Sequence, residues 1–408
     1  MITINNVDTI KEVNNLSVYL DNQAAKPVDE RVVKEMMEYF NDKFANPASL
    51  HCDGDIATDI LEKSRQKVAE FVNAPNAPDI IFTSGATESN NLALIGGANF
   101  YKRKGDHIII SEIEHISILN IVKHLEKDGF KISRLPVDRF GIVRLDKLEK
   151  LIRDDTILIS ISTASNEVGS LQPIEEISKI AQERKVLFHT DAVASESVIP
   201  LDLQKIPIDL VTLSSNDIYG PRGVGALYIK KGVRVNPIII GGGQERGFRS
   251  GSENVPGIVG FAKAAEIMKM IMSKEAGYLK ELRDKLIKNI LEKVPNSHLN
   301  GHPVKRLPHN AHFRFDYIEG ESLILTLKEN NIAAATGSAC SSKTLEPSHT
   351  LISMGLLHEE AHGSLLVSLG RTTKESDINK LIEILPESVK RLRKLSPLTP
   401  PDMLKELN

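Results

Sequence analysis

The chain has 408 residues, 41% of them hydrophobic and 26% charged, which is ordinary globular material and enough for two hydrophobic cores. Its formal net charge of −3 argues against the cationic field that attracts nucleic acid or an acidic membrane surface. No apolar run approaches the roughly 20 residues of a membrane helix, and no secretory leader follows Met1, so we expect a cytoplasmic protein without a nucleic-acid or membrane partner.

The chain has two cysteines, Cys52 and Cys340, in widely separated segments. Two thiols can neither staple a chain of this length nor complete a zinc site, so any cysteine chemistry rests on one thiol at a time. Cys52 fits the common role of a small buried hydrophobe.

From residue 79 onward, short β-rich runs alternate with helical patterns such as 87–101 and 116–126. This alternation predicts strands joined by crossover helices, and therefore a mainly parallel sheet covered on both faces. The predicted strands are 80–83, 108–111, 157–162, 186–190, 210–213 and 226–229.

The pattern changes in the C-terminal part of the chain. A helical stretch from 255 to about 294, with a break near 274–277, predicts a bridge into a second domain. Fewer strands follow, around 311–317, 333–335 and 365–369, before an amphipathic helix at 377–395 and a proline-rich tail that we expect to be extended. We therefore expect an α/β protein with a large domain, 29–273, and a smaller α+β domain made of 1–28 with 274–408.

Two positions at predicted strand ends have residues suited to ligand binding. Gly85 lies in SGAT between a strand and a helix, where backbone amides approach an anion, although a plain connection gives the same pattern. Asp191 ends a strand, where an open sheet places binding groups. Its carboxylate is suited to a protonated pyridine nitrogen, or else it caps the next helix.

Cys340 lies in TGSACSS, a run of small polar residues that predicts an accessible and reactive thiol. The glycine-rich segments 219–228 and 241–257 predict shaped loops, either at a ligand site or at a domain or subunit boundary.

Nine segments, in order, make the chain resemble the IscS/NifS-type cysteine desulfurases, which have the class V aminotransferase fold of pyridoxal-phosphate (PLP)-dependent type I transferases. The resemblance extends from about Tyr19 to Arg371. Its segments are YLDNQAAKPVDERV, FTSGATESNNLAL, SEIEH, SNEVGSLQPI, FHTDA, IYGPRGVGALY, GGGQERGFRSGSENVPGIVGF, GSACSS and SHTLISMGL.

The resemblance implies a PLP site, because in that family a lysine forms a Schiff base with PLP and a loop cysteine takes the substrate sulfur as a persulfide. Carried over residue by residue, it implies a histidine stacked on the ring, an amide near the ring hydroxyl, an aspartate at the ring nitrogen and a phosphate cradle completed by the partner subunit of a homodimer. These residues are His115, Asn166 and Asp191, then Ala86, Thr87 and Ser214 with Ser252 from the partner, and Cys340 as the persulfide cysteine. Only the resemblance favours this role of His115 over that of a satisfied core histidine.

The chain departs from the family at the residues that do the chemistry. Asn216 stands where the family has a histidine, and Asp217 stands where it has the PLP lysine. We still expect Asn216 to bind the cofactor. An aspartate cannot form an imine. Ala194 replaces a glutamine near the ring hydroxyl, and Leu366 replaces the arginine for the substrate carboxylate.

The resemblance, together with the loss of these catalytic side chains, predicts an IscS-like protein in iron–sulfur cluster assembly that acts with an IscU-like scaffold. Cys340 is expected to carry persulfide, to ligate a shared [2Fe–2S] cluster, or both, with PLP non-covalent or absent and desulfurase activity lost or very weak. One alternative is an active desulfurase with non-covalent PLP, in which Lys343 or an external amine replaces the lysine. Another is an interaction module that regulates a desulfurase through mixed dimers.

Overall fold

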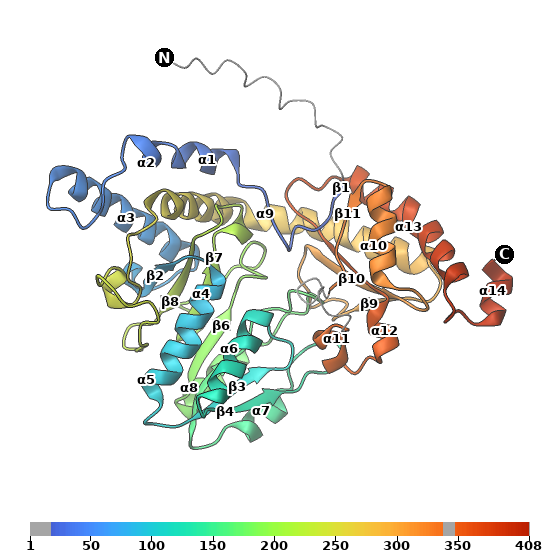
Figure 1. The fold of residues 1–408 in the computed structure, drawn as a ribbon, viewed down its shortest axis with the longest axis horizontal. Helices are drawn as coiled ribbons and strands as arrows, with labels where there is room; N and C mark the ends of the chain where they lie inside the picture. The colour runs from blue at the N-terminus through green and yellow to red at the C-terminus, as the bar shows by residue number, and fades with distance from the viewer. Residues whose placement is uncertain (1–17, 338–346, 408) are drawn as a thin grey trace, which may run out of the picture.

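The computed structural model describes residues 18–337 and 347–407, and its largest element is a seven-stranded sheet (Figure 1). Strand β8 is antiparallel to both neighbours and every other pair is parallel, so the predicted mainly parallel sheet is confirmed. In spatial order the strands are β2 (Ile80–Thr83), β8 (Gly225–Ile229), β7 (Leu210–Ser214), β6 (Leu187–Asp191), β5 (Thr156–Ser160), β3 (His107–Ser111) and β4 (Lys131–Leu135).

Helices cover both faces of this sheet because its strands are apolar on both sides. Ile80 and Phe82 belong to the core on one face, whereas Ile81 between them belongs to the core on the other. The helices of the large part are α1 (Glu30–Met36), α2 (Glu38–Asn41), α3 (Cys52–Phe71), α4 (Ala86–Asn91), α5 (Gly97–Tyr101), α6 (Ile116–Lys127), α7 (Leu145–Leu151) and α8 (Ile174–Arg184). A π-turn, Leu92–Gly96, joins α4 to α5.

Helix α9 (Val255–Lys293) is continuous over 39 residues and runs from the large sheet into the smaller part (Figure 1). The predicted break at 274–277 was therefore wrong. Met272 packs in the core of the large sheet and Leu279 in the core of the smaller part, so burial of both halves offsets the cost of about 1 kcal/mol for Gly277 in the helix interior.

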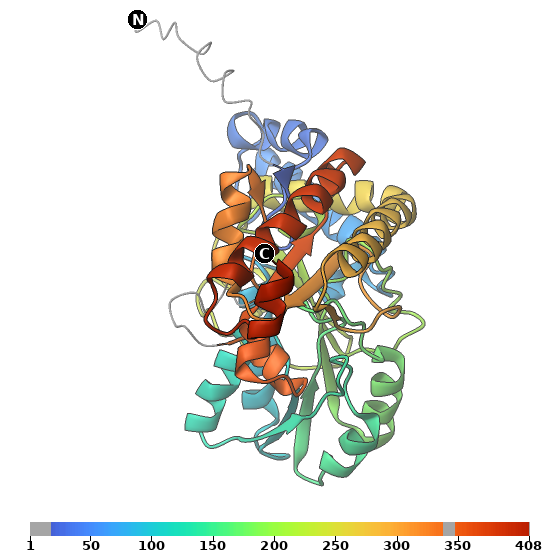
Figure 2. The same ribbon diagram turned by 90° about the vertical axis from the view of Figure 1, so that its right-hand side faces the viewer.

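The smaller part faces the viewer in Figure 2. It contains an antiparallel sheet in the order β12 (Ser364–Ser368), β10 (Asn310–Phe315), β9 (Ser297–Asn300). A separate parallel pair joins β1 (Val18–Tyr19) to β11 (Ile332–Ala333). The helices here are α10 (Gly320–Glu329), α11 (His349–Ser353), α12 (His358–His362), α13 (Glu375–Leu395) and α14 (Pro401–Leu407). The division at 273/274 stays a prediction, and the core cluster of the smaller part is separate from the clusters that cover the large sheet.

Two further local expectations were wrong. The tail ends in helix α14, because Pro401 is the first helical residue, where its missing N–H costs no hydrogen bond. Cys52 is exposed rather than buried, because it begins helix α3 beside polar residues. In the part of the chain that the structure describes, no helix is long and apolar enough to cross a membrane.

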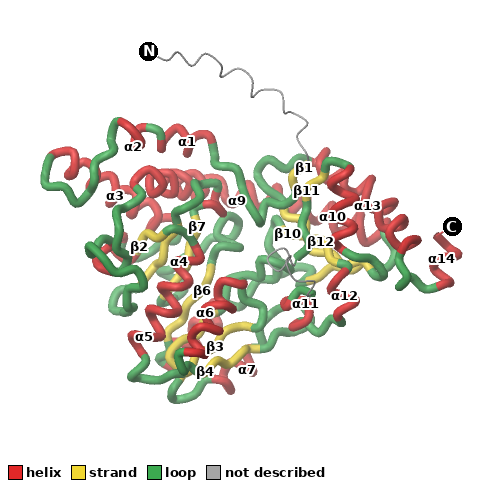
Figure 3. The backbone as a smooth tube through the Cα atoms, viewed as in Figure 1, coloured by secondary structure: helices red, strands yellow, loops and turns green. Residues whose placement is uncertain are grey.

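Loops at the ends of β6 and β7 lie between the large sheet and the smaller part (Figure 3). The loop after β5 forms a bridge between its own residues Ala164 and Leu171, and its Ser170 pairs with Arg306 of the smaller part. Polar side chains at the carboxyl ends of the strands are therefore brought together where the two parts meet.

Candidate active site

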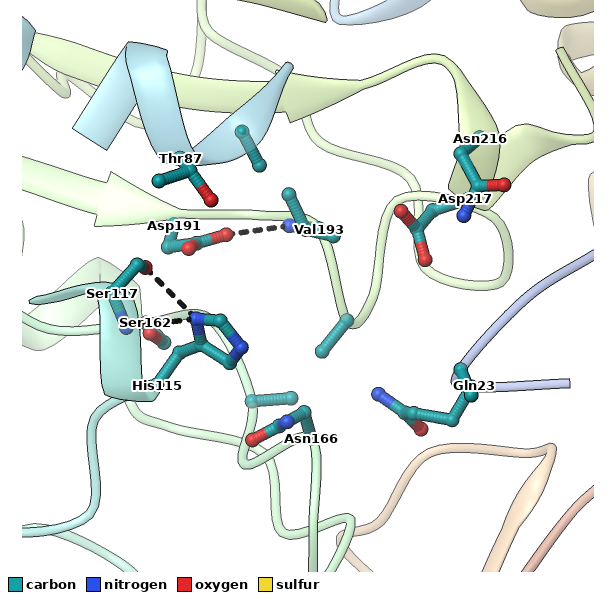
Figure 4. Close-up of a pocket in the computed structure, with 14 residues that line it drawn as sticks. Gln23, Thr87, His115, Ser117, Ser162, Asn166, Asp191, Val193, Asn216 and Asp217 are labelled. Atoms are coloured by element: carbon teal, nitrogen blue, oxygen red, sulfur yellow. Dashed lines mark hydrogen bonds between the residues drawn. The ribbon is translucent and has the colours of Figure 1, made fainter. Parts of the chain in front are cut away.

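A cavity of about 220 Å³ opens at the carboxyl ends of the parallel strands (Figure 4). The N-terminal segment contributes to its wall together with the loops after β2, β3, β5, β6 and β7. The lining residues are Gln23, Ala24, Ala86, Thr87, His115, Ser117, Ser162, Ala164, Asn166, Asp191, Val193, Ala194, Asn216 and Asp217.

Asp191 is the last residue of β6 and is buried at the cavity wall. Its carboxylate accepts hydrogen bonds from Asn90 Nδ2 at 2.8 Å and from the Val193 amide at 3.0 Å. Burial raises the pKa of this carboxyl group, while the hydrogen bonds from Asn90 and Val193 and the positive charge of His115 oppose the rise. Turns follow Asp191 directly, so it does not cap a helix.

His115 is half-buried and caps helix α6 while its ring faces the cavity (Figure 4). Its Nδ1 lies 2.8 Å from Ser117 Oγ and accepts from the Ser117 amide at 3.2 Å. Asn166 lies on the same side of the cavity (Figure 4).

The proposed phosphate cradle is partly assembled. Ala86 and Thr87 begin helix α4 and line the cavity, directly after Gly85, whose φ of 147° favours glycine. Ser214 is buried at the end of β7 and Ser252 is exposed in the loop before α9, and neither lines the cavity.

Asp217 lies in a 3₁₀ turn, Asn216–Ile218, and its carboxylate points into the cavity (Figure 4). Burial raises the pKa of the Asp217 carboxyl group, and the charge of Lys26 opposes the rise. Ala194 also lines the cavity. Leu366 does not line it, because it is buried on β12, where it exchanges backbone hydrogen bonds with Ala335.

Cys340 and Lys343 lie outside the described residues. Among residues 18–337 and 347–407, no cluster of three or more histidine, cysteine, aspartate or glutamate side chains is arranged to hold a metal ion.

Three buried ionisable residues around the cavity were missed from the sequence. Burial raises the pKa of Glu114 to about 7, although Ser111 and Ser162 donate hydrogen bonds to its carboxylate. Burial also raises the pKa of Glu196 well above its usual value. The third is Lys26, and its position between an alanine and a proline was the only local signal of its burial.

The mainly parallel sheet, the second α+β unit and the site between them define the class as a PLP-dependent transferase of fold type I. The aminotransferase class-V family model matches residues 18–381. Cysteine desulfurase IscS 1 of Archaeoglobus fulgidus is 55% identical over 93% of this chain and 99% of its own length. Cysteine desulfurase IscS of Methanosarcina thermophila is 48% identical, with 95% of each chain covered. A solved NifS-like protein is 37% identical with a TM-score of 0.87, covering 92% of this chain and 100% of that chain.

The chain therefore belongs to the IscS/NifS-type cysteine desulfurases of the class-V aminotransferase family. Membership implies PLP as the cofactor. The buried Asp191 carboxylate and the His115 ring in one cavity fit a protonated pyridine, but the Asp217 carboxylate offers no amine for a covalent link.

Proposed function

We propose that this chain is an IscS-like component of iron–sulfur cluster assembly in the cytoplasm with little or no cysteine desulfurase activity, and that it handles sulfur through Cys340. The observation that carries the proposal is the Asp217 carboxylate in the cavity wall. A carboxylate cannot form an imine with an aldehyde, and it adds negative charge where the family's chemistry uses an amine.

The remaining cavity residues support non-covalent PLP binding. Asp191 would pair with the ring nitrogen, His115 would stack on the ring, and Asn166 would approach the ring hydroxyl. The phosphate would lie against Ala86 and Thr87, with Asn216 beside the cofactor. The resemblance also assigns Ser214 to the phosphate, although Ser214 is buried and does not line the cavity. When bound, PLP supplies an electron sink for chemistry at an amino-acid α-carbon.

Two further departures weaken the desulfurase reaction. Leu366 offers no bidentate contact to a substrate carboxylate, and the loss of such a charge-assisted contact costs about 1.5–3 kcal/mol. Ala194 lines the cavity without the amide that its family counterpart directs at the ring hydroxyl.

The most direct experiment is a visible absorption spectrum of the purified protein with added PLP, followed by an assay of sulfide release from L-cysteine. We expect the spectrum of free, non-covalently held PLP and no appreciable sulfide. Turnover at the rate of an ordinary desulfurase would refute the proposal.

Cys340 is proposed to act by one of two routes. As a carrier, its thiolate attacks the terminal sulfur of a donor persulfide and the donor thiolate leaves, which moves one sulfur atom without an added oxidant. As a ligand, it completes a [2Fe–2S] cluster, the cargo of the reaction, held mainly by cysteines of an IscU-like scaffold.

Replacement of Cys340 by serine tests both routes. With a persulfide donor and scaffold under anaerobic conditions, we expect Cys340→Ser to abolish persulfide transfer. With scaffold, iron and sulfide under anaerobic conditions, we expect the same variant to shorten the lifetime of the shared cluster, as followed by its absorbance. Cys52→Ser is the matched control, since Cys52 is exposed on α3 away from the cavity residues. Equal behaviour of Cys340→Ser and the unmodified protein would argue against both routes.

We also propose a homodimer in which Ser252 reaches the partner's phosphate cradle. Ser252 is exposed and does not line its own chain's cavity. Exposed apolar side chains on and beside α1 and α2 offer a surface for a second copy, and a groove lined by Phe44 and Ile56 extends it. We define this dimer surface as Val33, Met37, Phe40, Phe44 and Ile56.

The second candidate is an active desulfurase that binds PLP without a covalent link and uses Lys343 or an external amine. The intact ring-binding residues favour it over a pure interaction module. Sulfide release from the unmodified protein that is lost in Lys343→Met would identify this activity.

A further inference from the structure

Lys26 is an unexplained buried amine beside the candidate site. The residue is 8% exposed, and its Nζ donates to the Asp217 backbone oxygen at 2.6 Å and to Ser197 Oγ at 3.0 Å. The amine also lies 5.2 Å from the centre of the Tyr219 ring. It therefore contacts the turn that carries Asp217 without lining the cavity itself.

The surroundings of Lys26 are mostly acidic. Asp217, Glu275 and Glu196 favour its charged form, in that order of strength, whereas Arg371 disfavours it and the buried His309 lies nearby. Burial lowers the pKa of the Lys26 amine, and the three carboxylates oppose that shift. A buried ammonium is stable only where anions compensate for its lost hydration.

The ionised forms of Glu196 and Asp217 need a cation for the same reason. Glu196 Oε1 accepts from the Ser214 amide at 3.0 Å, but its buried Oε2 has no hydrogen-bond partner. The negative charge of Asp217 further raises the pKa of Glu196, and Lys26 is the positive group that lowers it.

We propose that Lys26 is the buried countercharge that makes a carboxylate at position 217 tolerable, so that Lys26 and Asp217 form one charge unit in place of the family's single lysine. Lys26 is then a positioning residue. It holds the 216–218 turn through the Asp217 carbonyl and offsets the negative charge of the carboxylates at the cavity wall. The inference deepens the proposed function and rests on it only for the identity of the ligand.

The proposal makes the effect of removing Lys26 depend on residue 217. With Asp217 present, Lys26→Met leaves Asp217 and Glu196 without their cation. With lysine at position 217, two ammonium groups share one buried region, and Lys26→Met removes their repulsion. A role in packing or in hydrogen bonding alone predicts a loss of stability in both backgrounds.

The experiment measures thermal unfolding of four full-length proteins without cofactor: unmodified, Lys26→Met, Asp217→Lys and the double variant. We expect Lys26→Met to lower Tm by about 5 °C in the unmodified background and to raise Tm in the Asp217→Lys background. A loss of Tm in both backgrounds would refute the countercharge.

A second readout uses PLP and borohydride, with mass analysis of the adduct. We expect no adduct in the unmodified chain and a larger fraction modified at residue 217 in the double variant than in Asp217→Lys. An adduct on Lys26 of the unmodified chain would overturn the proposal, because Lys26 would then be a nucleophile rather than a countercharge. Sulfide release by the unmodified chain would instead contradict the proposed function and leave the Tm result intact.

Discussion

At the scale of single residues, the resemblance places three departures from the family's chemistry in this chain, at Asp217, Ala194 and Leu366. Asp191, His115 and Asn166 line the same cavity as Asp217. We propose that the side chains suited to the pyridine ring are retained, while the residue that the resemblance places at the covalent link is an acid. On the proposed function, binding and covalent capture of PLP are separable in this chain.

This separation predicts that Asp217→Lys creates a covalent link to PLP. The ring-binding residues and the start of α4 are already in place, so the new amine is the missing component. Borohydride reduction and mass analysis should locate a pyridoxyl adduct on residue 217. Leu366 and Ala194 remain in that variant, so we expect desulfurase activity to stay at least about tenfold below that of a family member with the arginine.

The same variant offers a test of the retained site. If Asp217→Lys yields no adduct while its fold is intact by circular dichroism, the cavity does not hold PLP in the family's orientation. Asp154→Lys, at an exposed position, is the control for non-specific modification of surface lysines.

Because the carboxyl group of Glu167 is buried, we expect the free energy of unfolding to depend on pH. Burial raises its pKa to about 7, although the Ser348 and Thr350 hydroxyls oppose the rise, and its Oε1 has no hydrogen-bond partner. Between pH 4.5 and 7 the folded state holds a proton that the unfolded state has released. The free energy of unfolding therefore falls as the pH rises through this window, by about 3 kcal/mol from Glu167 alone.

Urea unfolding at pH 5 and pH 8 measures this slope. Glu167→Gln should flatten it by about 3 kcal/mol, whereas Glu183→Gln at an exposed position should leave it unchanged. An unchanged slope in Glu167→Gln would show that this carboxyl group titrates normally in the folded protein.

At the scale of elements, α9 connects the two parts of the molecule, and two of its glycines have opposite surroundings. A Cβ added at Gly277 meets no atom within 4 Å. A Cβ at Gly260 would lie 2.6 Å from Met36 Sδ and 2.8 Å from Pro221 Cγ. One position has spare room on the helix surface, and the other is a close contact with α1 and the loop after β7.

We therefore expect opposite effects from the same substitution in one helix. Gly277→Ala should stabilise the protein by about 0.5–1 kcal/mol, because alanine loses less backbone entropy. Gly260→Ala should destabilise it by about 1–3 kcal/mol through overpacking. Urea unfolding of both variants measures the difference, and destabilisation by Gly277→Ala would indicate that α9 is interrupted near that residue.

At the scale of the whole molecule, the apolar dimer surface and the exposed Ser252 both favour a pair of chains. Val33, Met37 and Phe40 follow helical spacing on one exposed face, with Phe40 54% exposed. A single chain would leave this face in water and its phosphate cradle without Ser252.

Phe40→Glu should therefore shift the protein from dimer to monomer at micromolar concentration and weaken PLP binding by about tenfold or more. Light scattering and a PLP titration measure the two effects. Leu325→Glu, at an exposed apolar position on α10, is the matched control. A stable monomer of the unmodified protein would contradict the dimer.

The amount of structure that was predictable from the sequence differs between these scales. The central strands were predicted within one or two residues, because two-sided burial imposes a continuous apolar run. The sequence pattern wrongly predicted a break in helix α9 near Gly277 and an extended C-terminal tail. Both errors arise because local propensity does not include the tertiary packing that overrides it.

By itself, the sequence determined the family, the order of the strands along the chain and the identity of the residues at the strand ends, including the acid at position 217. All of these follow from local pattern and residue type. Only the tertiary structure brought Lys26 to Asp217, which lies 191 residues away, and left Leu366 outside the cavity. The reason is that burial and long-range hydrogen bonds depend on distances in space, and a pattern of neighbouring residues does not contain those distances.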